Sequence, residues 1–202
     1  MYIQITTKCN MECAHCCYSC TKTGEDMSIE TFRKCLENGD ECISIGGGEP
    51  TIHPRFSDFL LMAIGGCEYV WLATNGKETE IALVLAKLAK NGIIGCDLSQ
   101  DDYHECIDDL VIDAFMEGKQ RSREYINSGQ SRDMRGIRNV NAKEINQGRC
   151  DFGADDGCVC EDFFVRPNGD VYQCGCTDSP KIGNVNEGFE TAVDGCYKNP
   201  ED

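Results

Sequence analysis

Residues 2–16, YIQITTKCNMECAHC, join a short β-rich run to a cluster of cysteines, and this combination is the strongest indication of the fold. The run Tyr2–Thr6 is a strand candidate, because β-branched and aromatic residues favour strands. Three cysteines follow it in a C-x3-C-x2-C spacing: Cys9, Cys13 and Cys16. Such close spacing lets one loop place three thiolates around an iron–sulfur cube and leave the fourth iron open. From spacing alone, the alternative is a zinc or closed-cluster site with Cys17 or Cys20 as fourth ligand.

The abundance of cysteine favours metal binding over disulfide bonding. The chain has 202 residues, of which 16 are cysteines, a density typical of either a disulfide scaffold or a metal-binding protein. The chain is too large and too rich in helical and strand patterns to depend on disulfides, so we expect thiolate metal sites. Five cysteines stand singly in periodic segments and are expected to be small buried hydrophobic residues: Cys35, Cys42, Cys67, Cys96 and Cys106.

The charge distribution argues against nucleic acid as a partner. The formal net charge is −16, from 35 acidic and 19 basic residues, and such a surface repels phosphate. No stretch approaches the ~20 apolar residues of a membrane span, and the first residues lack a signal peptide's apolar core, so we expect a cytoplasmic protein without membrane contact. Segment 119–149 differs, with eight basic against three acidic residues. It is either a solvated stretch that neutralises an acidic neighbour or an anion site in which an arginine binds a carboxylate.

Short β-rich runs alternate with helical patterns through the first half of the chain, which predicts parallel βαβ units. Strands are expected over residues 2–6, 42–45, 69–73 and 93–98. Helices are expected over residues 28–38, 56–64, 78–90 and 106–115, the first with Ser28 as its N-cap. Four such repeats are too few for a closed eight-stranded barrel of ~250 residues. The predicted fold class is therefore α/β, with a partial, open barrel.

Unusual residues follow each predicted strand. They are, in chain order, Cys9, Gly46–Glu49, Thr74–Gly76 and Ser99–His104. Because the carboxyl ends of parallel strands meet at one edge of a sheet, we expect these four loops to converge on one site. Glycines let the backbone approach a ligand closely, and the Glu49 carboxylate suits an ammonium group.

The cysteine loop, placed directly after the first strand, resembles the signature of the radical S-adenosylmethionine (SAM) superfamily. The resemblance implies a partial (β/α)6 barrel in which Cys9, Cys13 and Cys16 bind a catalytic [4Fe–4S] cluster. In that family the amino and carboxylate groups of SAM chelate the open iron. Electron transfer from the reduced cluster then gives methionine and a 5′-deoxyadenosyl radical that abstracts hydrogen from the substrate. The residue between the second and third cysteines is often aromatic and near the adenine, and here it is His15.

Three further motifs extend the resemblance over roughly residues 1–105. Gly46-Gly47-Gly48-Glu49-Pro50 resembles the family's GGEP motif, which binds the amino group of SAM. Thr74-Asn75-Gly76 resembles a TNG motif after the third strand, and Ser99 with Asp101 resembles a Ser-x-Asp motif after the fourth. Both resemblances imply contacts with the ribose or sulfonium region of SAM. Either motif alone would indicate only a turn or a helix cap.

The loop over residues 101–105 brings several titratable side chains close to the predicted site. Tyr103 or His104 is a candidate for proton transfer or substrate contact. Asp101 and Asp102 are equally well explained as acids at the N-terminus of the following helix.

From residue 149 onward the composition changes, which predicts a small Cys-rich module, residues 149–202, behind a main domain of residues 1–148. Val165–Cys174 reads as a hairpin that turns at Asn168-Gly169. With Cys158 before the hairpin, this pattern resembles the auxiliary-cluster domains of the same superfamily, called SPASM and twitch domains. A full SPASM domain carries a further C-x2-C-x5-C-x3-C run that is absent here, so the resemblance implies a shortened, twitch-like module with one auxiliary iron–sulfur cluster. The expected ligands are Cys158, Cys160, Cys174 and Cys176, with Cys150 and Cys196 as replacements and a structural zinc as the alternative occupant.

Together these resemblances imply a radical SAM enzyme that modifies a peptide or protein. The expected reaction is thioether formation, epimerisation, crosslinking or oxidation, with a basic substrate on the acidic surface and a reductant such as flavodoxin or ferredoxin. The rival functions are a glycyl-radical-enzyme activase, a non-catalytic iron–sulfur protein for electron transfer or regulation, and small-molecule oxidation. A hydrogen-atom donor, if the reaction needs one, is expected among the other cysteines: Cys17, Cys20, Cys96 or Cys106.

Overall fold

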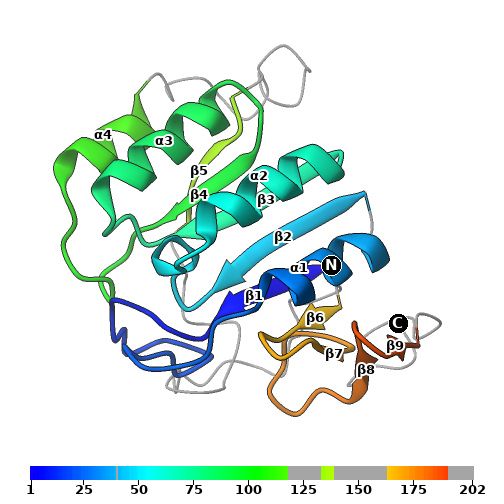
Figure 1. Ribbon diagram of the computed structural model, residues 1–202. Coiled ribbons are helices and arrows are strands. Elements are labelled where there is room, and N and C mark those ends of the chain that lie inside the picture. Colours follow the sequence, from blue (N-terminus) through cyan, green and yellow to red (C-terminus); the bar gives the residue numbers. More distant parts are fainter. Residues whose placement is uncertain (40, 118–132, 139–162, 191–202) are drawn as a thin grey trace, which may run out of the picture.

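The computed structural model describes residues 1–39, 41–117, 133–138 and 163–190 (Figure 1). These residues form one mixed sheet with the strand order β5-β4-β3-β2-β1-β6-β7-β8-β9. The first five strands pair in parallel: β1 (Tyr2–Thr6), β2 (Cys42–Gly47), β3 (Tyr69–Thr74), β4 (Gly95–Ser99) and β5 (Arg135–Arg138). The described sheet does not close on itself, so the predicted open, partial barrel is confirmed.

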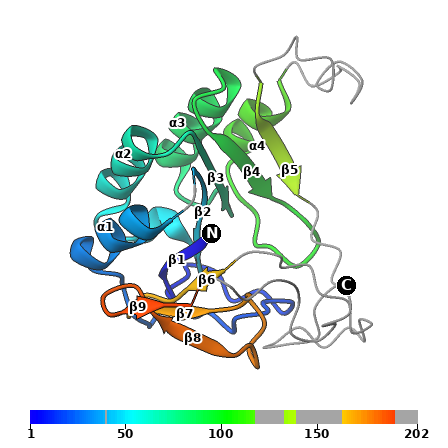
Figure 2. The same cartoon turned by 90° about the vertical axis from the view of Figure 1, so that its right-hand side faces the viewer.

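Four helices connect the parallel strands and lie together on one face of the curved sheet (Figure 2). They are α1 (Ile29–Asn38), α2 (Phe56–Gly66), α3 (Thr79–Lys90) and α4 (Asp109–Met116), with a short 3-10 turn over Pro50–Ile52. The core lies between the helices and the sheet, where the buried rings of Phe32 and Phe59 stack with centroids 4.3 Å apart. Among the described residues, no helix is both long enough and apolar enough to span a membrane.

The helix ends follow their capping residues. Ser28 caps α1, as predicted, and its hydroxyl accepts a hydrogen bond from the Thr31 main-chain N–H at 3.1 Å. The last predicted helix begins at Asp109, three residues later than expected, because the Asp108 carboxylate accepts from the Leu110 N–H and caps it there. Two residues were also missed at the end of α2, which continues through Gly65 and Gly66.

Strand β5 was not predicted, because its sequence, RGIR, has two arginines and lies in the basic segment. Arg135 is nevertheless buried, 6% exposed. Its guanidinium donates to the Asp133 carboxylate at 2.6 and 2.9 Å, to the Glu117 carbonyl at 2.6 Å and to the Ala114 carbonyl. A charge that is paired and hydrogen-bonded in this way can be buried next to a strand. The rest of the basic segment lies outside the described residues.

The described part of the Cys-rich tail continues the same sheet. Its strands are β6 (Phe164–Val165), β7 (Asp170–Tyr172), β8 (Lys181–Asn184) and β9 (Gly188–Phe189). The hairpin between β6 and β7 is confirmed, and its turn includes Gly169 at φ +87°, a conformation that favours glycine. β6 also pairs in parallel with β1, where the rings of Tyr2 and Phe164 stack 5.1 Å apart. The predicted domain boundary at residues 148 and 149 lies outside the described residues.

Candidate functional site

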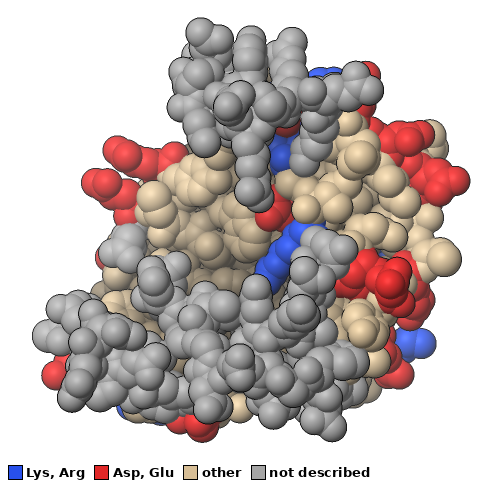
Figure 3. Space-filling model, turned by 180° about the vertical axis from the view of Figure 1, so that it is seen from behind, with Lys and Arg blue, Asp and Glu red and all other residues tan. Residues whose placement is uncertain are grey.

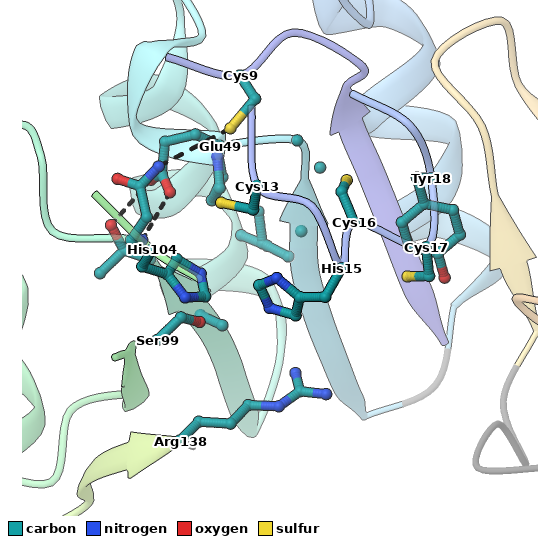
Figure 4. A pocket seen from close by; sticks show the side chains of 18 of the residues that line it. Cys9, Cys13, His15, Cys16, Cys17, Tyr18, Glu49, Ser99, His104 and Arg138 are labelled. Atoms are coloured by element: carbon teal, nitrogen blue, oxygen red, sulfur yellow. Dashed lines mark hydrogen bonds between the residues drawn. The ribbon is translucent and has the colours of Figure 1, made fainter. Parts of the chain in front are cut away.

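A pocket lies at the carboxyl ends of the parallel strands (Figure 4). Most of the predicted site residues line it: Cys9, Cys13, His15, Cys16, Gly46, Gly47, Gly48, Glu49, Thr74, Asn75 and Ser99. They come from the loop after β1, from the end of β2 and the loop after it, from the end of β3 with the residue that follows it, and from the end of β4. The fold therefore brings four separate stretches of sequence to one place, as parallel α/β topology requires.

The cysteine loop is held against the loop after β2 by main-chain hydrogen bonds. The Gly48 N–H donates to the Thr6 carbonyl at 2.8 Å, and the Glu49 N–H donates to the Lys8 carbonyl at 2.9 Å. A Cβ atom on Gly48 would lie 2.2 Å from that same Lys8 oxygen, so only glycine permits this approach. The glycine motif thus fixes the position of the cysteine loop in addition to lining the pocket.

Three thiols of the loop face the pocket, and their chemistry fits an iron–sulfur cluster with one open iron. Cys9, Cys13 and Cys16 all line the pocket, and no described cysteine is in a disulfide. Burial raises the pKa of Cys9 to about 11, so binding iron there requires the loss of a proton.

The two other cysteines of this loop lie differently. Cys20 is buried, 4% exposed, and does not line the pocket. Two main effects raise the pKa of Cys20 far above its usual range: the larger is a hydrogen bond with the Cys16 thiol, and the smaller is burial. Cys20 is therefore a neutral thiol. Cys17 lines the pocket beside Tyr18 (Figure 4). Because Cys17 lines the pocket and Cys20 does not, Cys17 is the better placed of the two alternative ligands.

Glu49 is a buried carboxylate held by donors from two loops. It is 1% exposed. Its Oε1 accepts from the Thr51 hydroxyl at 2.6 Å, the Thr51 N–H at 3.2 Å and the Thr74 hydroxyl at 2.8 Å, and its Oε2 accepts from the Asn75 N–H at 2.7 Å. Burial raises the pKa of Glu49, while these four hydrogen bonds act in the opposite direction. The carboxylate has neutral donors around it and lines the pocket, an arrangement suited to a cationic ligand group.

Asp101 lies behind the pocket wall and does not line the pocket. Its Oδ1 accepts from the Tyr103 and His104 N–H groups and lies 2.8 Å from His104 Nδ1. Its Oδ2 lies 3.4 Å from His15 Nε2. All three side chains are at least nine-tenths buried. One ligating atom from each of these three residues lies within 4.8 Å of the others, close enough for a metal ion. Asp101 Oδ1 is already engaged by His104 Nδ1, whereas Asp101 Oδ2 makes no hydrogen bond among the described residues.

Several residues of the pocket wall were not among the predicted cofactor-binding residues, although His104 was a candidate for proton transfer or substrate contact. His104 lines the pocket, held by Asp101. Arg138, at the end of the unpredicted strand β5, is in register with Ser99 and projects toward His15 (Figure 4). The excess of arginine in the basic segment was a signal for such a residue, but it did not distinguish Arg138 from the other arginines. Aromatic side chains complete the wall: Tyr2, Tyr18 and Trp71.

The predicted auxiliary site is described only in part. Cys174 and Cys176 follow β7, and both are buried, 1% and 8% exposed. The Cys174 N–H donates to the Ser179 hydroxyl at 3.0 Å, which folds this loop back on itself. The other expected or replacement ligands lie outside the described residues: Cys150, Cys158, Cys160 and Cys196.

The sequence is similar to known proteins over most of the region that forms the parallel strands. The profile of the radical SAM superfamily matches residues 3–141. A tungsten-containing aldehyde ferredoxin oxidoreductase cofactor-modifying protein of Pyrococcus furiosus is 37% identical over 67 residues, which are 30% of this chain and 19% of the relative. The mycofactocin maturase MftC of Mycobacterium ulcerans is 30% identical over 115 residues, 54% of this chain and 30% of MftC. The chain thus spans less than a third of the length of these relatives.

Solved structures show the same fold. BtrN in complex with AdoMet and 2-DOIA superposes with a TM-score of 0.57 at 14% identity, covering 93% of this chain and 78% of BtrN. The anSMEcpe structure with bound AdoMet and the Kp18Cys peptide gives a TM-score of 0.55 at 16% identity, covering 94% of this chain and 78% of anSMEcpe. Since the family profile matches well over half of the sequence, the chain belongs to the radical SAM superfamily, whose enzymes bind a [4Fe–4S] cluster and SAM.

Proposed function

We propose that Cys9, Cys13 and Cys16 bind the [4Fe–4S] cluster, that SAM binds beside them on Glu49, and that the chain modifies a peptide or protein. When bound, the cluster and SAM supply the 5′-deoxyadenosyl radical that abstracts hydrogen from the substrate. The observation that carries this proposal is the position of the buried Glu49 carboxylate in the same pocket wall as the three thiols.

Each part of the pocket has a task in this proposal. Glu49 receives the ammonium group of SAM, since four neutral donors hold its carboxylate rigidly and leave its charge uncompensated. His15 packs against the adenine, with its ring oriented by Asp101. Arg138 provides a guanidinium for a carboxylate of SAM or of the substrate.

A peptide substrate is supported by the relatives and by surface charge. One relative is a maturase by name, and one structural neighbour was solved with a bound peptide. Seen from behind, acidic side chains gather along the outer edges of the described surface, while the centre shows mostly uncharged residues with basic side chains among them (Figure 3). With a net charge of −16, the chain favours a substrate with basic groups around the reacting residue.

An auxiliary iron–sulfur cluster is the second part of the proposal. Cys174 and Cys176 are buried within two residues of each other, and thiols placed so closely are typical of metal ligands. Cys158 and Cys160 are the proposed partners. This cluster would exchange electrons with the substrate or with a reductant such as flavodoxin or ferredoxin.

The test is anaerobic incubation of the reconstituted protein with SAM and dithionite. We expect 5′-deoxyadenosine from the parent protein and none from Cys13→Ala. Cys42→Ala is the matched control. Cys42 was expected to be buried, as was Cys106, but both are exposed. Cys42 lies at the start of β2, at the opposite end of the strand from the pocket, so the variant should retain product formation. If the parent protein holds four irons at this site and gives no 5′-deoxyadenosine, the proposal is wrong. Adding candidate peptides and following their mass then identifies the modification.

A further inference from the structure

Asn75 joins the loop after β3 to the first cysteine of the iron-binding loop. Its side chain is buried in the pocket wall, and the residue is 6% exposed. The amide Nδ2 lies 3.8 Å from Cys9 Sγ and 2.8 Å from Asn10 Oδ1. The first of these hydrogen bonds is the dashed line that ends on the Cys9 sulfur in Figure 4. A side chain from the loop after β3 therefore donates to a thiol in the loop after β1.

The orientation of the Asn75 amide is fixed by its other contacts. Its Oδ1 accepts from the Lys77 N–H at 3.0 Å. A flipped amide would turn its NH2 group toward that N–H and its oxygen toward Asn10 Oδ1, so two hydrogen bonds would become two repulsions. The Asn75 main-chain N–H is also engaged, by Glu49 Oε2 at 2.7 Å. The NH2 group consequently has to face the Cys9 sulfur.

We propose that Asn75 is a positioning residue that raises the reduction potential of the cluster bound through Cys9, by donating a hydrogen bond to the Cys9 thiolate. This inference rests on the proposed function, because it requires the cluster to bind there. Reduction adds one negative charge, which the thiolate ligands share. A donor aimed at one of these sulfurs stabilises the reduced state more than the oxidised state.

The hydrogen bond from Asn75 connects the cysteine loop to a different loop of the site. Cys9 also accepts from the Met11 N–H at 3.4 Å, but that donor belongs to the cysteine loop itself. Asn75 belongs to the loop after β3 and bonds through its main chain to Glu49, the proposed partner of the SAM ammonium. One residue thus contacts both the carboxylate proposed for SAM and a sulfur proposed for the cluster.

The test is a potentiometric titration of the reconstituted full chain, with the reduced cluster followed by EPR in the absence of SAM. Asn75→Leu keeps the approximate volume and removes the donor, and Asn75→Asp keeps the shape and the acceptor of the Lys77 N–H but adds a negative charge. We expect the reduced-to-oxidised ratio at a fixed potential to fall about three- to tenfold in Asn75→Leu, and further in Asn75→Asp because its added charge acts in the same direction. At 59 mV per tenfold change, the fall in Asn75→Leu is a shift of about 28 to 59 mV to more negative potential.

Asn10→Ala is the matched control, because it removes the other partner of Asn75 Nδ2 and leaves the bond to Cys9 in place. Its potential should equal that of the parent. Asn75 variants that hold four irons with an unchanged potential would overturn the inference. An equal shift in Asn10→Ala would overturn it too, since anchoring of the loop would then explain the effect. A parent protein that binds no four-iron cluster would instead overturn the proposed function, and this inference with it.

Discussion

The loops after β2 and β4 each bury one carboxylate beside the same pocket, and they use it in opposite ways. Glu49 lines the pocket, and its donors come from its own loop and from the end of β3. Asp101 is turned away from the pocket, and its contacts are with its own loop and with His15. Similar burial therefore accompanies two different arrangements of partners.

The pKa values of the two groups shift in opposite directions. Burial raises the pKa of Glu49 even though four neutral groups donate to it. Burial also acts to raise the pKa of Asp101, but hydrogen bonds from His104 and the Tyr103 N–H, together with the charges of both histidines, outweigh it and lower the pKa. Glu49 thus gains most from a cation that arrives with a ligand, whereas Asp101 already has partners within the protein.

The largest expected effect is that of Glu49→Gln on SAM binding. We expect the affinity of the reconstituted protein for SAM to fall about 100-fold, because the ammonium group loses a buried, charged partner. Equilibrium dialysis with labelled SAM measures this. Glu105→Gln is the control, since Glu105 is an exposed acid paired with Lys77, and its affinity should stay within about twofold of the parent. If Glu49→Gln binds SAM as the parent does, Glu49 has no ligand to hold and the contrast with Asp101 disappears.

A smaller effect is expected for Asp101→Asn in the same assay. The amide oxygen can still accept from the Tyr103 and His104 N–H groups, but the second carboxylate oxygen, which lies 3.4 Å from His15 Nε2, is replaced by an NH2 group. We expect SAM affinity to fall about three- to tenfold as the His15 imidazole loses its fixed orientation. A loss as large as that of Glu49→Gln would mean that Asp101 contacts the ligand directly, as the Ser-x-Asp resemblance implied.

Much of the fold could be predicted because its signals are local. Hydrophobic periodicity and capping residues such as Ser28 predict the helices and strands of the first half of the chain. The unusual residues in the loops after the strands predict the position of the pocket. Strand β5 was missed because RGIR looks solvent-exposed until Asp133 and the carbonyl groups of α4 and its C-terminal end surround Arg135. The pairing of β6 with β1 was missed because no local pattern specifies a partner so distant in the chain.

The composition of the site was easier to predict than the direction of its side chains. A motif places Asp101 and Asn75 at strand ends, but it does not say which way each side chain turns. Asp101 turns toward two histidines, one in its own loop and one in the cysteine loop, and Asn75 turns its amide toward Cys9 and Asn10 in the cysteine loop. These contacts depend on tertiary packing, which spacing and composition do not encode.

The smallest expected effect concerns a third carboxylate, Asp26, whose partners also belong to the protein. Burial opposes its ionisation, but hydrogen bonds from Lys8 and Thr6 at 2.5 and 2.7 Å lower its pKa. Because the folded-state pKa is the lower one, Asp26 stabilises the fold above about pH 4, and this contribution is lost as the pH falls through the folded-state value. We expect Asp26→Asn to reduce the free energy of unfolding by about 1 kcal/mol at pH 7 and by less at pH 3.

Urea unfolding of the cluster-free protein at the two pH values measures this difference. Asp58→Asn is the control, because Asp58 forms an exposed pair with Arg55 and should contribute little. If Asp26→Asn lowers the free energy of unfolding equally at both pH values, the ionised Asp26 carboxylate does not account for the stabilisation.

The pairing of β6 with β1 has a consequence for how the protein is made. β1 has β2 on one side, and its other side is covered only when Phe164 and Val165 arrive. At ~5–20 residues per second, the roughly 160 residues between these strands take about 10 to 30 s to synthesise. During that interval the strand leading into the cysteine loop is an open edge of the nascent sheet, exposed to pairing with other chains. Iron that arrives before β6 has paired with β1 therefore meets a cysteine loop whose preceding strand still lacks one of its two neighbours.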